Sequence, residues 1–142
     1  RAAPIQVIEG ESWDTMAHAD VALAASGTVT TEAALLGTPV VIFYKVAAAT
    51  YWLGRMLVNV PYYSIVNLVA ERPLVPELIQ YDMTGERMAA EVARLLDDHE
   101  ARARMRAGLA EVKRKLTGEG DPIGIAAAEI QDLLRGYPAH VS

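Results

Sequence analysis

The spacing of apolar and polar positions divides the chain into short β segments and longer amphipathic helices. Two apolar runs, residues 21–25 and 39–46, are predicted to form strands, and the first, which no polar residue interrupts, has the pattern of a strand that is buried on both faces of a sheet. Between them, residues 29–36 are predicted to form a helix that ends at Gly37, because glycine commonly caps helix C-termini. This order predicts a βαβ unit with parallel strands and a right-handed crossover.

The regions on either side of this unit are predicted to add one strand and several helices. Residues 5–8 are expected to form a short strand that ends at Gly10, and residues 12–19 a short helix with Ser12 as its N-cap. Residues 61–80 contain several prolines and are expected to be mostly loop, ending in a short helix over 76–79. After a linker over 118–124, a last helix is expected over 125–134. Helical spacing also marks two long helices, the first capped by Thr84, at Met88, Val92, Leu95 and Leu96 and at Met105, Leu109, Val112 and Leu116.

The predicted fold is therefore α/β, with a Rossmann-like parallel sheet flanked by helices. A length of 142 residues and a hydrophobic content of 52% fit one ordinary domain with a substantial core. The net charge of −5 argues against a nucleic-acid partner, and the lack of cysteine excludes a disulfide scaffold and a thiolate metal site. No apolar run reaches the roughly 18 residues of a membrane span. Because the chain starts at Arg1, we expect a piece of a longer protein or a processed one.

The strongest chemical signal is the sequence Ala-Ala-Ser-Gly-Thr-Val-Thr-Thr-Glu at residues 24–32. A buried strand runs through a small-residue turn into a helix N-terminus, whose N–H groups and positive dipole end suit a phosphate. Ser26 and Thr28 add hydroxyl groups, Gly27 permits close approach, and Glu32 is placed to accept hydrogen bonds from the hydroxyls of a ribose. The alternative is that Ser26 or Thr28 merely caps the helix and that Glu32 only complements its dipole.

Two sets of motifs resemble a known enzyme family. The run Ser26-Gly27-Thr28-x-Thr30-x-Glu32-x4-Gly37-x-Pro39 resembles the donor-binding motif of GT-B glycosyltransferases that use UDP-N-acetylglucosamine-type donors. Over roughly residues 19–96 the chain resembles lipid-A-disaccharide synthases more closely than the lipid II-forming transferases, in which the serine and glutamate stand one residue further apart. The family usually has proline at the position of Val66 and glycine at that of Glu71. Four sequence motifs favour the lipid-A-disaccharide synthases over the lipid II-forming transferases: Thr50-Tyr51-Trp52-Leu53-Gly54-Arg55, Pro61-Tyr62, Asn67-Leu68-x-Ala70-x-Arg72 and Val75-Pro76-Glu77-Leu78-Ile79-Gln80.

This resemblance implies the C-terminal half of a GT-B enzyme. Residues 1–118 would form the UDP-sugar-binding domain. Residues 119–142 would form a linker and a helix that packs on an absent N-terminal domain or is exchanged between two copies in a homodimer. Ser26, Gly27 and Thr28 would hold the UDP pyrophosphate, and Glu32 the ribose. Asn67 would lie near the donor, Arg72 would reach phosphate or structure its own loop, and the backbone at Val7, Ile8 and Glu9 would grip uracil.

The implied reaction of the whole enzyme is the transfer of 2,3-diacylglucosamine from UDP to 2,3-diacylglucosamine 1-phosphate, in lipid A biosynthesis. UDP is released, no metal or other cofactor is expected, and the catalytic base is expected in the N-terminal domain, so this chain alone would be inactive. The enzyme would act as a peripheral protein at the cytoplasmic face of the bacterial inner membrane. The alternatives are another GT-B UDP-N-acetylglucosamine transferase, an epimerase, or a non-catalytic nucleotide-binding module.

Two further groups of residues are candidates for membrane contact. Tyr51, Trp52, Arg55 and Met56 combine aromatic, apolar and cationic side chains, which suits either a lipid-facing patch or a helix packed in the core. The histidines are far apart in the sequence and show no metal-ligand spacing. A locally basic stretch either attracts anionic headgroups or forms a solvated helix face; it consists of Arg102, Arg104, Arg106, Lys113, Arg114 and Lys115.

Overall fold

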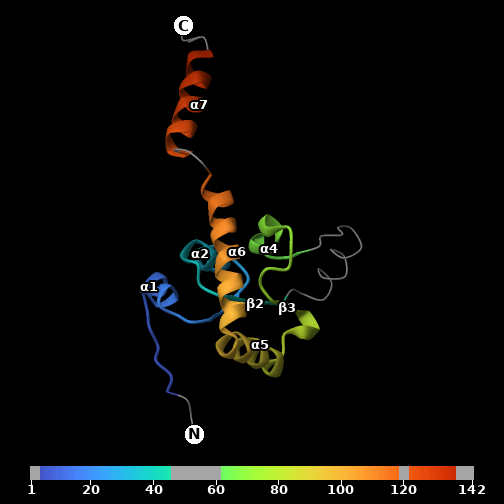
Figure 1. Ribbon diagram of the computed structural model, residues 1–142. Helices are drawn as coiled ribbons and strands as arrows, with labels where there is room; N and C mark the ends of the chain where they lie inside the picture. Colours follow the sequence, from blue (N-terminus) through green and yellow to red (C-terminus); the bar gives the residue numbers. More distant parts are fainter. Residues whose placement is uncertain (1–3, 46–61, 119–121, 137–142) are drawn as a thin grey trace.

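A three-stranded parallel sheet lies at the centre of the computed structural model, which describes residues 4–45, 62–118 and 122–136 (Figure 1). The strands are β1 (Ala22–Ala25), β2 (Val40–Tyr44) and β3 (Glu77–Ile79), arranged in the order β1-β2-β3. Ala24 pairs with Ile42, and Ile42 pairs with Glu77. The predicted α/β fold with a parallel sheet flanked by helices is thereby confirmed.

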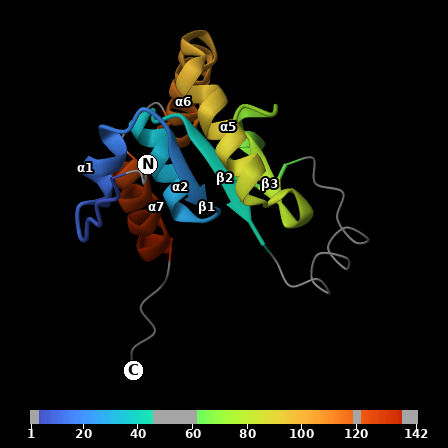
Figure 2. The ribbon, with the colours of Figure 1, turned by 90° about the horizontal axis from the view of Figure 1, so that it is seen from below.

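Helices cover both faces of the sheet. Figure 2 shows α5 (Gly85–Asp97) on one face, and α2 (Thr28–Leu36) and α6 (His99–Thr117) on the other. The short helix α4 (Ile65–Ala70) packs against α2 and α6, and α1 (Ser12–Ala17) packs against α2. A single 3-10 turn, η1 (Gln80–Asp82), follows β3. The last helix, α7 (Pro122–Gly136), lies beyond the end of α6 and away from the sheet (Figure 1).

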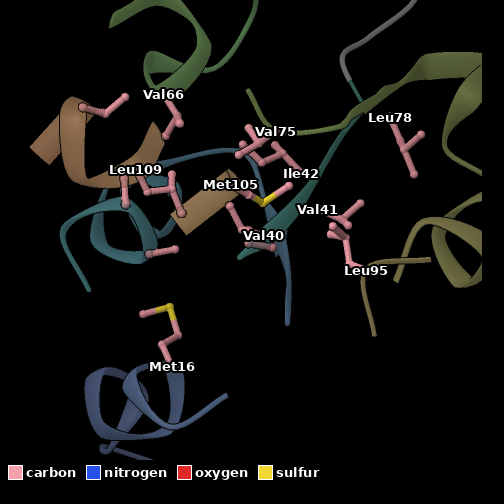
Figure 3. Close-up of a cluster of buried hydrophobic side chains, with 14 residues drawn as sticks. Met16, Val40, Val41, Ile42, Val66, Val75, Leu78, Leu95, Met105 and Leu109 are labelled. Carbon is pink, nitrogen blue, oxygen red and sulfur yellow. The ribbon is translucent and has the colours of Figure 1, made fainter. Parts of the chain in front are cut away.

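The core is organised around β2, whose side chains alternate between the two layers of helices. Val41 points toward Leu95 of α5, whereas Val40 and Ile42 point to the opposite side, where Met105 of α6 lies (Figure 3). These three side chains are 2% exposed or less, so the predicted second strand is confirmed, and it is buried on both faces over residues 40–42. The prediction of a strand buried on both faces was made for residues 21–25 and is wrong there, because β1 lies at the sheet edge and its Leu23 is 45% exposed.

Three local predictions are wrong. Residues 76–79 were expected to be a helix, but Glu77–Ile79 is a strand, because parallel pairing with β2 outweighs the helical appearance of a short run after proline. The region 61–80 was expected to be mostly loop, but Ile65–Ala70 is helical and is capped by Ser64, which accepts a hydrogen bond from the Asn67 amide. Residues 5–8 form no strand and are exposed.

The joint between α5 and α6 is closed by polar groups. Thr84 accepts a hydrogen bond from the Arg87 amide at the start of α5, as expected, and Asp98 accepts one from the Ala101 amide at the start of α6. The buried guanidinium of Arg102 donates to the carbonyls of Leu95 and Leu96, which are left without helical partners at the end of α5. This side chain of the basic stretch therefore fixes one helix end to the next helix.

The two positions that depart from the family pattern lie in and just after α4. Val66 is the second residue of this helix, where a proline would remove no helical hydrogen bond, and its side chain is fully buried. Glu71 ends the helix in the left-handed conformation, with φ 56° and ψ 23°. That conformation suits glycine, so glutamate at this position carries a conformational cost.

We expect the substitution Glu71→Gly to raise the free energy of unfolding by about 1 kcal/mol, because glycine adopts the left-handed conformation without strain. Urea denaturation followed by circular dichroism measures the change. The matched control is Glu100→Gly, in the first turn of α6, which is expected to lower stability by up to ~1 kcal/mol. Equal destabilisation by both substitutions would contradict the argument.

A second prediction concerns the pH dependence of the α6 cap. The hydrogen bond from the Ala101 amide is the main cause that lowers the pKa of Asp98 below its ordinary value of 3.8. A lowered pKa in the folded state means that the cap stabilises the protein above the unfolded pKa and loses this contribution as the pH falls through the folded pKa. Asp98→Ala should therefore reduce the melting temperature at neutral pH, and the difference from the unsubstituted chain should shrink in acid.

Thermal unfolding between neutral and strongly acidic pH measures this difference. Asp97→Ala is the control, since it removes the neighbouring carboxylate and leaves the cap in place. A difference between Asp98→Ala and the unsubstituted chain that stays constant down to the most acidic pH would show that the carboxylate is not the source of the stabilisation.

Candidate functional site

The turn from β1 into α2 forms an open loop at the carboxyl edge of the sheet. The Ser26 amide donates to the Phe43 carbonyl at 2.9 Å, which fixes the loop to β2. Gly27 has φ 155° and ψ −161°, a backbone conformation that L side chains rarely adopt, and no atom lies within 4 Å of the position that its Cβ would occupy. Gly27 and Thr28 are both exposed. The loop therefore presents accessible backbone at the start of a nine-residue helix.

The N-terminus of α2 differs from those of α4, α5 and α6. In those three helices a side chain of Ser64, Thr84 or Asp98 accepts a hydrogen bond from an amide of the first turn. The N-cap of α2 is Gly27, and no side chain among the described residues caps this helix. The Thr30 amide donates to the Gly27 carbonyl, whereas the amides of Thr28 and Val29 remain available to an external acceptor, and the positive end of the helix dipole favours an anion.

Thr30 holds this loop in shape. Its hydroxyl donates to the Gly27 carbonyl at 2.8 Å, and the residue is only 2% exposed. The sequence showed Thr30 as a member of the motif but gave it no task; its spacing of three residues from Gly27 is the local signal for this bond. Glu32 lies four residues after Thr28, so the two share one side of α2. The helix thus places a half-buried carboxylate one turn from the open amides.

A second polar arrangement joins α4 to β3. One oxygen of the Glu77 carboxylate accepts from the Ser64 amide at 2.8 Å and from Asn67 Nδ2 at 2.9 Å, and the other accepts from the Tyr63 amide at 3.1 Å. Asn67 also bonds both backbone groups of Val75: Nδ2 donates to the Val75 carbonyl, and Oδ1 accepts from the Val75 amide, each at 2.9 Å. With 1% exposure, Asn67 has no open surface toward solvent.

A cavity of about 850 Å³ lies between the segment before β3 and helices α5 and α6. Asn67 and Arg72 line it, whereas Ser26, Gly27 and Thr28 do not. The structure therefore separates the predicted donor-site residues into two groups, one at the α2 loop and one around this cavity. The cavity carries charges of both signs, and they include the ion pair of Arg72 with Glu111 at 3.0 Å.

Comparison with known proteins assigns the chain to a family. The model of the lipid-A-disaccharide synthetase family matches residues 2–120. The chain belongs to this family. It is 59% identical to the lipid-A-disaccharide synthase of Solibacter usitatus over 140 residues, and 45% identical to that of Nitrosococcus oceani over 113 residues. It is also 46% identical to that of Geobacter sulfurreducens over 112 residues.

The chain spans only part of these lipid-A-disaccharide synthases. The match covers 99% of this chain but 37% of the Solibacter usitatus protein. For the relative from Nitrosococcus oceani, the match covers 80% of this chain and 29% of that protein. The motif over residues 24–32 thus belongs to a region of about one third of the relatives' length.

The predicted site residues differ in their surroundings. Ser26 is half-buried, and Gly27 and Thr28 are exposed at the start of a helix without a side-chain cap, so their contact with a phosphate stays a prediction. Asn67 faces its own domain in this structure, so its contact with a donor stays a prediction. For Arg72, the ion pair with Glu111 is the contact expected of the loop-structuring alternative, and contact with phosphate stays a prediction.

The structure gives little or no support to the roles predicted for the remaining site residues. The expected strand around Ile8 is absent: Val7 is 83% exposed and Ile8 is 46% exposed, so a grip on uracil by these backbone groups stays a prediction. The lipid-facing residues Tyr51, Trp52, Arg55 and Met56 lie outside the described residues. Among the described residues, no group of three or more histidine, aspartate and glutamate side chains is arranged to hold a metal.

The basic stretch of this family member is only partly a surface. Arg102 is 7% exposed and caps α5, and Lys115 donates to the Val69 carbonyl at 2.9 Å near the end of α4. The other five residues of the stretch are exposed, and contact with headgroups stays a prediction for them. In the described part of the chain, no helix combines the length and the apolar character that crossing a membrane requires.

Proposed function

We propose that this chain is the donor-binding half of a lipid-A-disaccharide synthase and that the N-terminus of α2 binds the pyrophosphate of UDP-2,3-diacylglucosamine. The observation that carries the proposal is the open start of α2 directly after a strand: α4, α5 and α6 are capped by their own side chains, and α1, which also lacks a side-chain cap, follows no strand. Family membership supplies the class of substrate, and the geometry of the α2 loop supplies the place.

The task of this site is to stabilise the leaving group. When an acceptor hydroxyl attacks the anomeric carbon, the bond from that carbon to the pyrophosphate oxygen breaks, and negative charge builds on UDP. The open amides of α2 and its helix dipole are fixed before the reaction and point where that charge develops. Ser26 and Thr28 would donate hydroxyl hydrogen bonds to the phosphates, and Glu32 would accept hydrogen bonds from the ribose. The proposal assigns this work to protein groups, without a metal or other cofactor.

The remaining parts of the reaction are assigned to the rest of the longer protein. The acceptor, 2,3-diacylglucosamine 1-phosphate, and the general base would be held by the N-terminal domain, so the hydroxyl attacks directly and the anomeric configuration inverts. The enzyme would work at the cytoplasmic face of the inner membrane, where both acylated substrates partition. Ile130 and Leu133 of α7 are 58% and 68% exposed, which supports packing of α7 on that domain or its exchange in a homodimer.

The substitution Gly27→Val tests the proposed site. A β-branched side chain strains the backbone at φ 155° and fills the open space above the loop, so the dissociation constant for UDP should rise about tenfold or more. A titration followed by NMR at the amides of Thr28, Val29 and Glu32 measures the affinity. Gly85→Val at the start of α5 is the control and should leave it unchanged. Equal affinity of both variants would remove the α2 loop as the site.

The division of labour between the two halves gives another expected outcome. The 142-residue chain should bind UDP but form no disaccharide from the two acylated substrates, because the proposal places the base and the acceptor site outside it. A radiolabelled acceptor assay with detergent-solubilised substrates measures turnover, and a full-length relative serves as the positive control. Disaccharide formation by this chain alone would show that it contains the catalytic base.

A further inference from the structure

The Asn67–Glu77 pair, defined by the hydrogen bonds of these two side chains, holds three separate segments together. Glu77 receives the amides of Tyr63 and Ser64, which precede α4, and Asn67 within α4 binds both backbone groups of Val75. The direct bond from Asn67 Nδ2 to Glu77 Oε1, at 2.9 Å, joins the two sets. One amide and one carboxylate thus connect the approach to α4, the helix itself and the entry to β3.

Every N–H group of the Asn67 side chain is used inside the domain. One hydrogen of Nδ2 points to the Val75 carbonyl and the other to Glu77, and Oδ1 accepts from the Val75 amide. The residue is 1% exposed, and its neighbours Val66 and Val75 are 0% and 2% exposed. A nucleotide that took a hydrogen bond from this amide would have to open the core and break an internal bond.

The pair is in a position to influence the α2 loop without touching a ligand. Glu77 pairs with Ile42, which pairs with Ala24, so Glu77 lies in one row across the sheet with the residue two places before Ser26. Neighbours in such a row lie about 4.8 Å apart and point to the same face. That face carries α2 and α4, which contact each other. Fixing α4 to β3 therefore fixes one of the surfaces against which α2 rests.

Glu77 also makes the N-termini of α4 and α2, which lie in the same layer, electrostatically different. Its carboxylate accepts from the amides of Tyr63 and Ser64 just before α4, and the Ser64 hydroxyl accepts from the Asn67 amide within it, whereas the start of α2 has no such group. An anionic ligand is repelled by the carboxylate at α4 and attracted by the open amides at α2. The pair consequently does two things: it holds α4 in place, and it leaves α2 as the anion-binding helix start.

We propose that Asn67 and Glu77 are positioning residues for the donor site and that neither contacts the nucleotide. The proposal rests on the proposed function, since it explains how two side chains remote from the α2 loop support UDP binding there. It assigns a functional role to Glu77 and replaces direct donor contact by Asn67 with an action through α4.

The first test uses the unsubstituted chain and UDP as the probe. In an NMR titration, the amides of Thr28 and Val29 should shift, and the Nδ2 signals of Asn67 should stay in place. Shifts of the Asn67 side chain as large as those of Thr28 would overturn the positioning role and leave the proposed function intact. An absence of shifts anywhere would instead overturn the proposed function, and this inference with it.

The second test uses charge. Asn67→Asp places a carboxylate against Glu77, so UDP affinity should fall about tenfold. Adding Glu77→Gln to this variant removes the like-charge repulsion and should recover about half of that loss or more on a logarithmic scale. Glu91→Gln, on the same cavity, is the control and should bind UDP as the unsubstituted chain does. A double variant no better than Asn67→Asp would overturn the proposal. If Asn67→Asp fails to fold, the side-chain shifts of the first test decide.

Discussion

The parallel pairing of three short strands is the constraint on which the other features depend. Because β1, β2 and β3 run in the same direction, their carboxyl ends meet at one edge, and the chain must return across a face of the sheet after β1 and after β2. The return after β1 is α2, so this helix necessarily starts at the carboxyl edge. The location of the candidate site is thus a consequence of strand direction, and only its chemistry depends on the residues of the loop.

The open start of α2 illustrates a balance between stability and function. A serine, aspartate or asparagine at the N-cap would stabilise this helix by a few tenths of a kcal/mol relative to glycine, through a side-chain cap of the kind that α4, α5 and α6 have. The chain has Gly27 there instead, with serine and threonine on either side. Thr30 offsets part of the loss, because its hydroxyl bonds the Gly27 carbonyl and keeps the loop in one shape without using an amide that a phosphate would need.

The sequence was sufficient where structure is determined locally. The apolar run that forms the strand β2, the glycine that ends α2 and the threonine cap of α5 can be predicted from a few neighbouring residues, and all three are confirmed. The same holds for the α2 loop, whose small residues between a strand and a helix predict an open turn. The motif also supplied the family, which the comparisons confirm.

The sequence was not sufficient where contacts between distant segments determine the local structure. Residues 77–79 are a strand because β2 lies beside them, and nothing in four residues after a proline reveals that neighbour. The internal hydrogen bonds of Asn67, which the resemblance places near the donor, could not be predicted either, because a motif does not show which way a side chain points. Its partners, Val75 and Glu77, are 8 and 10 residues away, and only the return of the chain into β3 brings them together.

The two departures from the family pattern, Val66 and Glu71, also lie in a segment whose position depends on tertiary contacts. Val66 lies in α4 beside the buried Asn67 and Glu71 follows the helix as its C-cap, and neither removes a hydrogen bond of the Asn67–Glu77 pair. Val66 fills the core beside Leu109 (Figure 3), and Glu71 accepts a strained conformation at the helix end. Because the pair binds α4 from its first turn and Lys115 binds the Val69 carbonyl near its last, the helix is held at both ends. A helix of six residues has little stability of its own, so these tertiary contacts determine its position, and the sequence between them is free to vary.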